Sequence, residues 1–511
     1  MGSMVAREGT EVRRCSLGEL LAGIADGALS AAERGRVVTG LFDDSRLVKP
    51  GSVFVAVCGT RADGRAFVAD ALRRGASVLI GEGLERAAGA LVINVDDARA
   101  ALARLAARWW GLDRPPASAV RLLGVTGTNG KTTVAYMTRA ILQAAGLRCA
   151  LLGTVEYDLC DGEVRPADMT TPGPLELAEK IARCVAAGAQ AVVMEVSSHA
   201  LAQRRTDGLR FAAAAFTNLT QDHLDYHGTL AAYLEAKARL FARLDGAALA
   251  VINRDDASAE AVLRRCRARV LGYGLERAAE LTASVVSETL SATQYRLRLG
   301  GGELSVTQRL VGRHNVYNAL AAAGLARALE VPHEAIGRGL SGLPGVPGRL
   351  QRVPCLRQID VFVDYAHTDD ALRNVTGVLR PLTRGRLIVV FGCGGERDRT
   401  KRPLMARAAA AQADLVIVTS DNPRSEDPQA IIAEALKGLA AGPQPRVIVE
   451  PDRRLAIGIA LREARPGDLV LIAGKGHEKY QVIGQERLPF DDVEVARAAA
   501  EELAGGGCTG A

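Results

Sequence analysis

A glycine-rich turn that carries a lysine and two threonines is the part of the sequence best suited to chemistry. Residues 123–133 read Leu-Gly-Val-Thr-Gly-Thr-Asn-Gly-Lys-Thr-Thr, between a short apolar run and a helical pattern. Glycines let backbone N–H groups point into one concavity, a helix N-terminus adds positive potential, Lys131 adds a charge, and Thr132 offers a hydroxyl to Mg²⁺. Val125 stands where the usual loop has its first glycine. The turn predicts a nucleotide-phosphate site, and the alternative is an ordinary strand-to-helix turn.

A carboxylate and a histidine are candidates for holding a metal beside that turn. An apolar strand pattern at 191–194 ends in Glu195, and a carboxylate beside a phosphate loop commonly holds Mg²⁺. The alternative is a strand-end glutamate that faces solvent. The chain has seven histidines, and an isolated histidine is more often structural than a ligand. Only for His223, clustered with Asp222 and Asp225, do we favour a role as a ligand.

Lys237 is unusual for its position. The apolar side chains around it recur at helical spacing, and the lysine lies in the middle of that stripe: Leu230, Tyr233, Leu234, Leu240, Phe241 and Leu244. Burial lowers the pKa of a lysine and leaves a neutral amine, which CO₂ can convert into an anionic, metal-binding carbamate. The alternative is a lysine whose ammonium reaches solvent. From spacing alone we favour that second alternative.

Two arginines in the last third could recognise a substrate with two carboxylates. Arg397 and Arg424 each follow an apolar strand pattern, and each guanidinium can bind one carboxylate in a bidentate manner. Glu478, and Asp421 with Asn422, could receive an ammonium group. An amino acid with charges at both ends is therefore the predicted ligand. The glycines at 392–395 resemble a dinucleotide turn, but we give that cluster no weight.

The elements that must position these residues indicate an α/β protein. A chain of 511 residues is long enough for about three domains, and Pro- and Gly-rich joints occur at 113–118 and 342–348. We therefore expect domains at 1–116, 117–344 and 345–511. A strand is predicted at 52–57 and a helix at 67–74. Buried-strand patterns separated by helical stretches predict a parallel sheet near the C-terminus, with ligands at the strand ends: 387–391, 415–419 and 469–473.

Composition excludes several classes of protein. The formal net charge is +6, but the basic residues are scattered without aromatic residues between them, so a nucleic-acid platform is not expected. The nine cysteines stand singly with no CxxC pair, which favours a reducing compartment over a disulfide scaffold. The sequence has no apolar run of membrane-spanning length, and its first residues lack the apolar core of a signal peptide, so we expect no secretory leader. We expect a cytoplasmic protein that is not inserted in a membrane.

Taken together, the motifs resemble those of the Mur ligase family of ATP-dependent peptidoglycan-precursor ligases. The resemblance covers nearly the whole chain, and its ordered blocks lie at 44–46, 59–64, 126–133, 170–173, 194–199, 222–228, 312–318, 364–367, 392–398, 421–424 and 474–478. It implies an N-terminal α/β domain that binds a uridine nucleotide, a central P-loop ATPase domain with a mainly parallel sheet, and a C-terminal Rossmann-like domain that binds the amino acid. It also implies Mg²⁺ as cofactor and ATP as co-substrate.

The resemblance assigns roles to individual residues. Catalysis is carried by Lys131, Glu195, His223 and Lys237. Contacts to ATP are implied for Gly127, Thr128, Asn129, Gly130, Lys131, Thr132, Thr133 and Asn318. Contacts to the UDP-muropeptide are implied for Asp43, Ser45, Thr60, Arg61, Ala62, Met169, Thr170, Thr171, Ser197, Gln203 and Arg205. Met169 stands where relatives often have Asn. The Mg²⁺ ligands are Thr132, Glu195, His223 and a carbamylated Lys237, so the resemblance reverses the preference drawn from spacing.

For the C-terminal domain, the resemblance implies contacts to meso-diaminopimelate. They are assigned to Arg397, Asp421, Asn422, Pro423, Arg424, Gly474 and Glu478. The Asp-Asn-Pro-Arg segment marks the diaminopimelate-adding members, whereas lysine-adding members have another residue at Arg424. A buried arginine left without its carboxylate partner rejects lysine strongly. The other implied substrate is UDP-N-acetylmuramoyl-L-Ala-D-Glu, and we expect a monomer.

Three alternatives stay open at this point. The chain could be a lysine-adding ligase of the same family, or a folylpolyglutamate synthase, which lacks the early uridine-site blocks. From another class, it could be a nucleotide-dependent switch that binds muropeptides without joining them. The presence of Lys131, Glu195, His223 and Lys237 argues against the switch.

Overall fold

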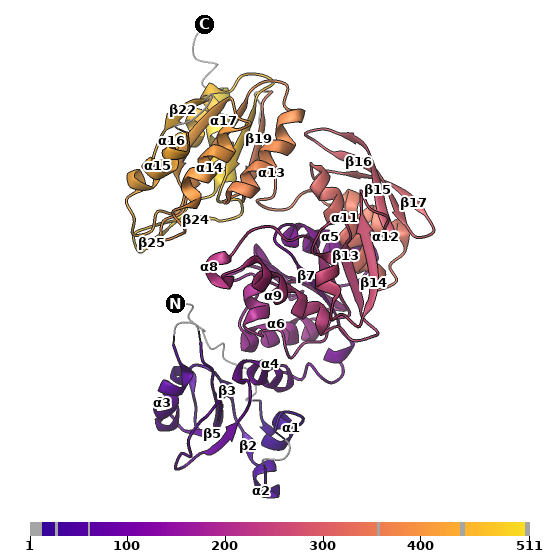
Figure 1. The fold of residues 1–511 in the computed structure, drawn as a ribbon, viewed down its shortest axis with the longest axis vertical. Helices are drawn as coiled ribbons and strands as arrows, with labels where there is room; N and C mark the ends of the chain where they lie inside the picture. The colour runs from indigo at the N-terminus through magenta and orange to yellow at the C-terminus, as the bar shows by residue number, and fades with distance from the viewer. Residues whose placement is uncertain (1–12, 26–28, 60–61, 355–357, 440–444, 506–511) are drawn as a thin grey trace.

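The computed structural model describes residues 13–25, 29–59, 62–354, 358–439 and 445–505. Thr60 and Arg61, two of the predicted uridine-nucleotide contacts, lie outside the described residues. Three larger β-sheets follow one another along the described chain, beside two two-stranded ones, and in Figure 1 the central sheet lies between the N-terminal part below and the C-terminal part above.

The N-terminal part is built on a four-stranded parallel sheet in the order β3-β4-β5-β6. Its strands are β3 (Leu41–Phe42), β4 (Ser52–Ala56), β5 (Ala76–Gly81) and β6 (Leu91–Asn94). All five residues of β4 are buried, because helices cover both faces of the sheet. The other elements are β1 (Cys15–Ser16), α1 (Leu17–Leu21), α2 (Ala31–Arg34), β2 (Val37–Val38), η2 (Ser45–Leu47), η3 (Gly64–Phe67), α3 (Val68–Arg73) and α4 (Ala98–Trp109).

The central sheet has eleven strands in the order β10-β9-β8-β11-β7-β12-β13-β14-β15-β16-β17. The strands from β8 to β15 in this order are parallel, and the outer pairs at both edges are antiparallel. Their bounds are β7 (Arg121–Thr126), β8 (Cys149–Leu152), β9 (Glu156–Asp158), β10 (Val164–Pro166), β11 (Ala191–Glu195), β12 (Ala213–Phe216), β13 (Leu249–Asn253), β14 (Arg269–Gly274), β15 (Leu281–Glu288), β16 (Thr293–Leu299) and β17 (Glu303–Gln308).

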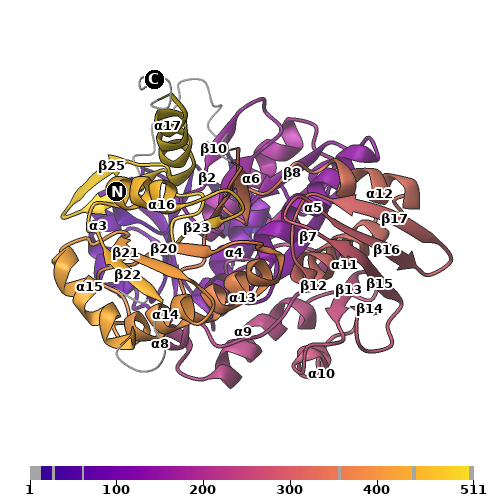
Figure 2. The same ribbon diagram turned by 90° about the horizontal axis from the view of Figure 1, so that it is seen from above.

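Helices bury the central sheet on both faces. One core forms against α5, α11 and α12, and a second forms on the opposite face against α6, α7, α9 and α10. Figure 2 shows these two layers on either side of the strands. The helices are η4 (Ala117–Ala119), α5 (Lys131–Ala144), α6 (Pro174–Ala186), α7 (Ser198–Ala202), α8 (Leu224–His227), α9 (Leu230–Ala242), α10 (Ala259–Leu263), α11 (Arg313–Arg327) and α12 (His333–Gly342).

The C-terminal part has a six-stranded sheet in the order β18-β19-β23-β20-β21-β22, parallel except for β18. The strands are β18 (Gln351–Val353), β19 (Asp360–Asp364), β20 (Leu387–Cys393), β21 (Leu415–Ser420), β22 (Arg446–Val449) and β23 (Leu469–Ala473), with a separate hairpin of β24 (Tyr480–Ile483) and β25 (Glu486–Pro489). The helices are α13 (Asp369–Leu379), η5 (Arg380–Leu382), α14 (Lys401–Ala410), α15 (Pro428–Leu436), η6 (Lys437–Leu439), α16 (Arg453–Glu463) and α17 (Asp492–Gly505).

The structure confirms the predicted α/β class with a mainly parallel central sheet. The strand predicted at 52–57 is β4, and the three strands predicted near the C-terminus are the neighbours β20, β21 and β23. The helix predicted at 67–74 is shorter, because residues 64–67 form a 3₁₀ turn capped by Asp63. The domain boundaries at 116 and 344 fall outside the strands and stay predictions. Among the described residues, none of the helices combines the length and apolarity needed to cross a bilayer.

Candidate active site

The predicted phosphate loop connects the end of β7 to the start of α5 at the centre of the molecule (Figure 1). Gly127 and Gly130 have φ values of 151° and 89°, which disfavour any residue with a side chain. A Cβ atom at Gly127 would stand 1.8 Å from Thr217 Oγ1, and one at Gly130 would stand 2.4 Å from Asn318 Oδ1. The loop therefore requires both glycines, and Asn318, a predicted ATP contact, lies against it.

The segment after β12 fixes the other residues of the loop. The backbone N–H groups of Thr128 and Asn129 donate to the carbonyl and side-chain oxygens of Asn218, at 2.8 and 2.9 Å. The N–H of Thr220 donates to the Thr128 hydroxyl oxygen at 3.0 Å. Thr132 and Thr133 are buried in the first turn of α5. The loop is thus held by hydrogen bonds before any nucleotide binds.

Two lysines donate to a single carbonyl of this loop. Lys131 Nζ lies 3.0 Å and Lys237 Nζ 2.8 Å from the Gly127 oxygen, so the two nitrogens are within about 6 Å of each other and their charges repel. Lys237 is only 1% exposed, and its ammonium lies 4.2 Å from the centre of the Tyr233 ring. Burial, and then the charge of Lys131, lower the pKa of Lys237 well below its usual value. The preference for a solvent-exposed Lys237 was wrong.

Glu195 is buried at the end of β11 and faces the start of α5. Its carboxylate accepts hydrogen bonds from the Thr132 hydroxyl at 3.0 Å and from the backbone N–H and hydroxyl of Thr154 at 2.8 and 3.0 Å. The alternative of a solvent-facing glutamate is therefore wrong. Thr154, which orients the carboxylate from the loop after β8, was not found from the sequence because a single threonine in a loop gives no signal.

His223 begins α8 in a left-handed backbone conformation with φ of 52°. Its side chain is 45% exposed, its Nε2 lies 3.4 Å from Asp222 Oδ2, and its ring centre is 4.8 Å from that of His199. Partial burial lowers the pKa of His223 to about 4, so the imidazole is neutral at neutral pH, which is the form that binds metals. Lys401 of α14 reaches Asp222 from the C-terminal part at 3.8 Å.

The predicted Mg²⁺ ligands do not make a cage by themselves. Among the described residues, no three His, Cys, Asp or Glu side chains are arranged to hold a metal ion. The Thr132 hydroxyl and the Glu195 carboxylate face each other, and oxygen donors of this kind suit Mg²⁺, which commonly completes its shell with phosphate oxygens and water. The ammonium of Lys237 cannot itself ligate a cation, because it has no lone pair to donate.

Five of the residues predicted to bind the UDP-muropeptide form one cluster next to Glu195: Met169, Thr171, Ser197, Gln203 and Arg205. The Thr171 hydroxyl donates to the Glu195 carbonyl at 2.9 Å and accepts from the Ser197 N–H at 3.1 Å. Arg205 donates to the Thr171 carbonyl at 2.6 Å and to Gln203 Oε1 at 2.7 Å, and it lies 3.9 Å from Met169 Sδ. Since these partners are neutral, the guanidinium keeps its charge available for an acidic ligand.

The remaining predicted uridine contacts lie in the N-terminal sheet. Asp43 and Ser45 follow β3, and Ala62 lies in a turn after β4 in which the Gly59 N–H donates to the Ala62 carbonyl at 2.9 Å. Because β3 and β4 are parallel neighbours, the two segments meet at the same edge of the sheet. Thr170 lies instead in the central part of the chain, where its hydroxyl is 3.0 Å from that of Thr154.

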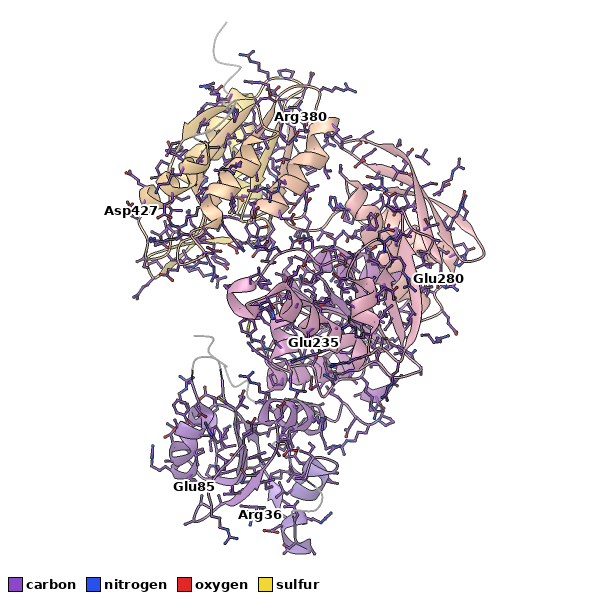
Figure 3. All side chains as sticks on the ribbon, in the orientation of Figure 1. Arg36, Glu85, Glu235, Glu280, Arg380 and Asp427 are labelled. Carbon is purple, nitrogen blue, oxygen red and sulfur yellow. The ribbon has the colours of Figure 1, made fainter. Side chains whose placement is uncertain are left out.

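Arg397 and Arg424 come together at the end of β20. A Cβ atom at Gly394 would stand 3.3 Å from Arg424 NH1 and 3.5 Å from Arg397 Cγ, so the two arginines flank this glycine. Arg424 has a left-handed φ of 54°, and its NH1 donates to the Gly395 carbonyl at 2.6 Å. Pro423 packs on Gly395, where a Cβ would stand 1.9 Å from the proline carbonyl oxygen. Asp427, labelled in Figure 3, ends this loop and caps α15.

The side chains predicted to bind the ammonium of a substrate already contact the ammonium of a lysine in the chain, Lys475. Lys475 is fully buried, and its Nζ lies near the side chains of Asp421, Asn422 and Glu478. Gly474 has φ of 115°, and a Cβ there would stand 3.2 Å from Asp421 Oδ2. Lys475 belongs to the motif at 474–478, but nothing in the sequence indicates that its side chain points inward.

Arg349 and Asp364 are two further candidates for the phosphate site. Arg349 follows the joint predicted at 342–348, and its NH2 donates to the Thr132 hydroxyl at 3.2 Å while the guanidinium lies 5.0 Å from the centre of the Tyr365 ring. Asp364 ends β19, accepts from the Leu350 N–H at 2.6 Å, and has a pKa that burial raises. Arg349 lies just after the predicted joint, and no motif in the sequence marked it.

A buried ion pair fixes the strand ends that carry the amino-acid loops. The guanidinium of Arg453 in α16 donates to both oxygens of Asp492 at 2.7 Å, to the Ser420 carbonyl at 3.3 Å and to the Ala473 carbonyl at 2.9 Å. Both charged side chains are fully buried. Ser420 and Ala473 immediately precede Asp421 and Gly474, so one guanidinium sets the spacing of the two loops. The sequence pattern could not predict this pair, because Arg453 and Asp492 lie far apart along the chain.

Asp492→Asn should destabilise the C-terminal part by about 3–5 kcal/mol, because the Arg453 guanidinium would stay buried without an anion. Thermal unfolding of the purified variant measures the effect. Asp491→Asn is the matched control, since Asp491 pairs only with the exposed Lys479 and asparagine also accepts the hydrogen bond from the Val493 N–H. Equal stability of the two variants would contradict the importance of the buried pair.

Comparisons with known proteins agree on one family. The family descriptions that match are the catalytic domain of the Mur ligase family at 37–110, the Mur ligase middle domain at 125–326, and the glutamate ligase domain of Mur ligases at 348–476. The chain is 46% identical to UDP-N-acetylmuramoyl-L-alanyl-D-glutamate–2,6-diaminopimelate ligase of Solibacter usitatus over 94% of this chain and 97% of that protein. It is 47% identical to the ligase of the same name from Gloeobacter violaceus, over 90% and 94%.

Solved structures show the same relationship. A structure of UDP-N-acetylmuramoyl-L-alanyl-D-glutamate–2,6-diaminopimelate ligase matches with a TM-score of 0.71 and 35% identity, covering 96% of this chain and 99% of the other. UDP-N-acetylmuramoylalanyl-D-glutamyl-2,6-diaminopimelate–D-alanyl-D-alanyl ligase from Acinetobacter baumannii shares the fold, with a TM-score of 0.60 at 19% identity, covering 91% and 96% of the two chains.

Proposed function

This chain belongs to the Mur ligase family, and we propose from that premise that it joins meso-2,6-diaminopimelate to the D-glutamate of UDP-N-acetylmuramoyl-L-alanyl-D-glutamate, with ATP as the energy source, in peptidoglycan synthesis. The observation that supports the choice of amino acid is that Arg397 and Arg424 both lie against Gly394 at the end of β20. Two arginines at one strand end suit an amino acid with a second carboxylate.

The first step activates a carboxyl group. The γ-carboxylate oxygen of D-glutamate attacks the γ-phosphorus of ATP, the bond from that phosphorus to the bridging oxygen breaks, and ADP leaves with the electron pair. Lys131 supplies positive charge to the transferring phosphoryl group, and the backbone N–H groups of the loop bind the other phosphates. Arg205 and Thr171, which lie next to Glu195, hold the acidic end of the muropeptide close to that phosphoryl group.

The second step forms the amide bond. The neutral amine of diaminopimelate attacks the carbonyl carbon of the acyl phosphate, the nitrogen releases a proton to water, and inorganic phosphate leaves with the electron pair of the broken C–O bond. Arg397 and Arg424 each hold one carboxylate of diaminopimelate, which fixes the position of the reacting amine. Closure of the C-terminal part about the joint at 342–348 brings the amine to the acyl phosphate and excludes water.

Mg²⁺ belongs to this proposal as the cofactor, held by Thr132, Glu195, His223 and carbamylated Lys237. When bound it neutralises charge on the phosphate oxygens. The crowding of Lys131 and Lys237 on one carbonyl supports the modification, because it favours the neutral amine that reacts with CO₂. Carbamylation turns Lys237 from a cation into an anion, so its charge attracts Lys131 and no longer repels it. We propose further that the protein acts as a monomer in the cytoplasm.

The proposed reaction predicts ADP release only with the right amino acid. Purified protein with ATP, Mg²⁺ and UDP-N-acetylmuramoyl-L-Ala-D-Glu should release ADP with meso-diaminopimelate and at least about 10³-fold more slowly with L-lysine, since lysine leaves a guanidinium unpaired. A coupled assay for ADP measures both rates. Release with lysine alone would support the lysine-adding alternative, and release with neither would support the non-catalytic switch.

A further inference from the structure

Lys475 occupies the middle of the proposed amino-acid site. Its side chain is fully buried, and its Nζ lies 3.4 Å from Asp421 Oδ1, 3.2 Å from Glu478 Oε2 and 3.0 Å from Asn422 Oδ1. The Tyr480 ring centre lies 5.6 Å from the same nitrogen. All three oxygen partners belong to the residues assigned to the substrate's ammonium, so one lysine contacts the whole acidic side of the site.

The hydrogen bonds of the Asn422 amide fix the orientation of the side chains around Lys475. Its Oδ1 accepts from Lys475 and, at 2.9 Å, from the Val482 N–H of the β24 strand, while its Nδ2 donates to Glu478 Oε2 at 2.9 Å. Every polar atom of the amide therefore meets a partner of the correct kind. Lys475 is the centre of a network that fixes three side chains from two different loops.

The net charge of the network matches one further cation. Asp421 and Glu478 bring two negative charges, and Lys475 brings one positive charge. Lys475 offsets one of the two negative charges. The remaining single negative charge matches one substrate ammonium.

Stability alone does not account for a buried lysine at this place. Burying an ammonium is costly, and replacing a buried ion pair by apolar residues is often neutral or stabilising. Apolar residues at 421, 475 and 478 together would fill the same space without that cost. The presence of a charge here is better explained by what it does to Asp421 and Glu478 as ligands.

We propose that Lys475 is a positioning residue that orients Asp421, Asn422 and Glu478 and offsets one of the two negative charges, and thereby sets the site to accept one ammonium group of the amino-acid substrate. The inference rests on the proposed function of this site. It assigns to Lys475 a role in the affinity for the amino acid, and none in the binding of ATP or the UDP-muropeptide.

Lys475→Met tests the inference, since methionine has a similar length and no charge. We expect KM for meso-diaminopimelate to rise about 10²-fold, while KM for ATP and for the UDP-muropeptide changes less than about twofold, because only the acidic side of the amino-acid site loses its counter-ion. Lys479→Met is the matched control in the same loop, with a side chain that is 80% exposed, and should leave all three KM values unchanged.

The comparison of the three KM values separates this role from a merely structural one. A general loss of structure would affect the use of all three substrates, whereas the inferred role affects KM for diaminopimelate alone. An equal rise in all three KM values would overturn the inference.

A charge-compensated variant keeps the test valid if Lys475→Met does not fold. Lys475→Met combined with Glu478→Gln leaves one carboxylate and restores the single negative charge, so it should use diaminopimelate better than Glu478→Gln alone, by about 10-fold. No recovery in the double variant would also overturn the inference. A wild-type protein that releases no ADP with diaminopimelate would instead overturn the proposed function, which separates the two failures.

Discussion

Replacing Lys237 by alanine is expected to lower kcat about 10³-fold, because the change removes a charged group from the centre of the phosphate site. Lys237 is buried and shares the Gly127 carbonyl with Lys131, so the substitution leaves a small cavity beside the loop. If the lysine acts as a carbamate, a short-chain carboxylate can enter that cavity and supply the missing anion. Acetate or propionate in the assay should then restore activity at least about 10-fold, which is measured as ADP release.

Lys131→Ala is the control for this rescue. It removes the other lysine on the same carbonyl, but the lost charge is positive, so an added carboxylate should not restore activity. Rescue of both variants, or of neither, would contradict a carbamate at Lys237. Mass spectrometry under CO₂ gives a second readout, because the modification adds a carboxyl group to the residue in the native protein.

Replacing Arg424 by alanine is expected to raise KM for meso-diaminopimelate about 10²–10³-fold and to leave KM for ATP nearly unchanged, because a charge-assisted contact with the second carboxylate is lost. Within the described part of the chain, the hydrogen bonds of its guanidinium to Gly395 and Asn422 come from NH1 alone, so Nε and NH2 face outward from them. The preference over lysine should fall by the same factor, which parallel assays with the two amino acids measure.

Arg446→Ala is the matched control, since Arg446 belongs to the same domain and its exposed guanidinium pairs with Glu463. This variant should leave unchanged both KM for meso-diaminopimelate and the preference for it over lysine. Arg424→Lys should fall between wild type and Arg424→Ala, because a lysine keeps the charge but not the planar pair of donors. If KM for ATP rose as much as KM for diaminopimelate in Arg424→Ala, the residue would be structural.

The phosphate loop and the parallel strands could be predicted from the sequence because their signals are local. Gly127 and Gly130 are fixed by backbone conformation over a few residues, and β20, β21 and β23 appear as short apolar runs. Side chains that follow parallel strands must meet at one edge of the sheet, so the meeting of Arg397 with Arg424 was also predictable.

The burial of Lys237 could not be decided from spacing. A lysine on an apolar helical stripe either reaches solvent or stays inside, and the choice depends on what packs over that face of α9. Here the phosphate loop covers it, and the Gly127 carbonyl accepts its hydrogen bond. The tertiary structure decided the question, because the covering loop lies 110 residues away in the sequence.

The sequence by itself determined the family, the α/β class and the segments that we propose to hold each ligand, because these depend on short motifs and on periodic burial. Only the tertiary structure decided that Arg349 reaches Thr132, that Arg453 joins two strand ends, and that Lys475 lies between Asp421 and Glu478. The physical reason is that a buried charge is tolerated only where partners from distant segments converge on it. Such convergence is a property of the packed chain and leaves no mark in the local pattern.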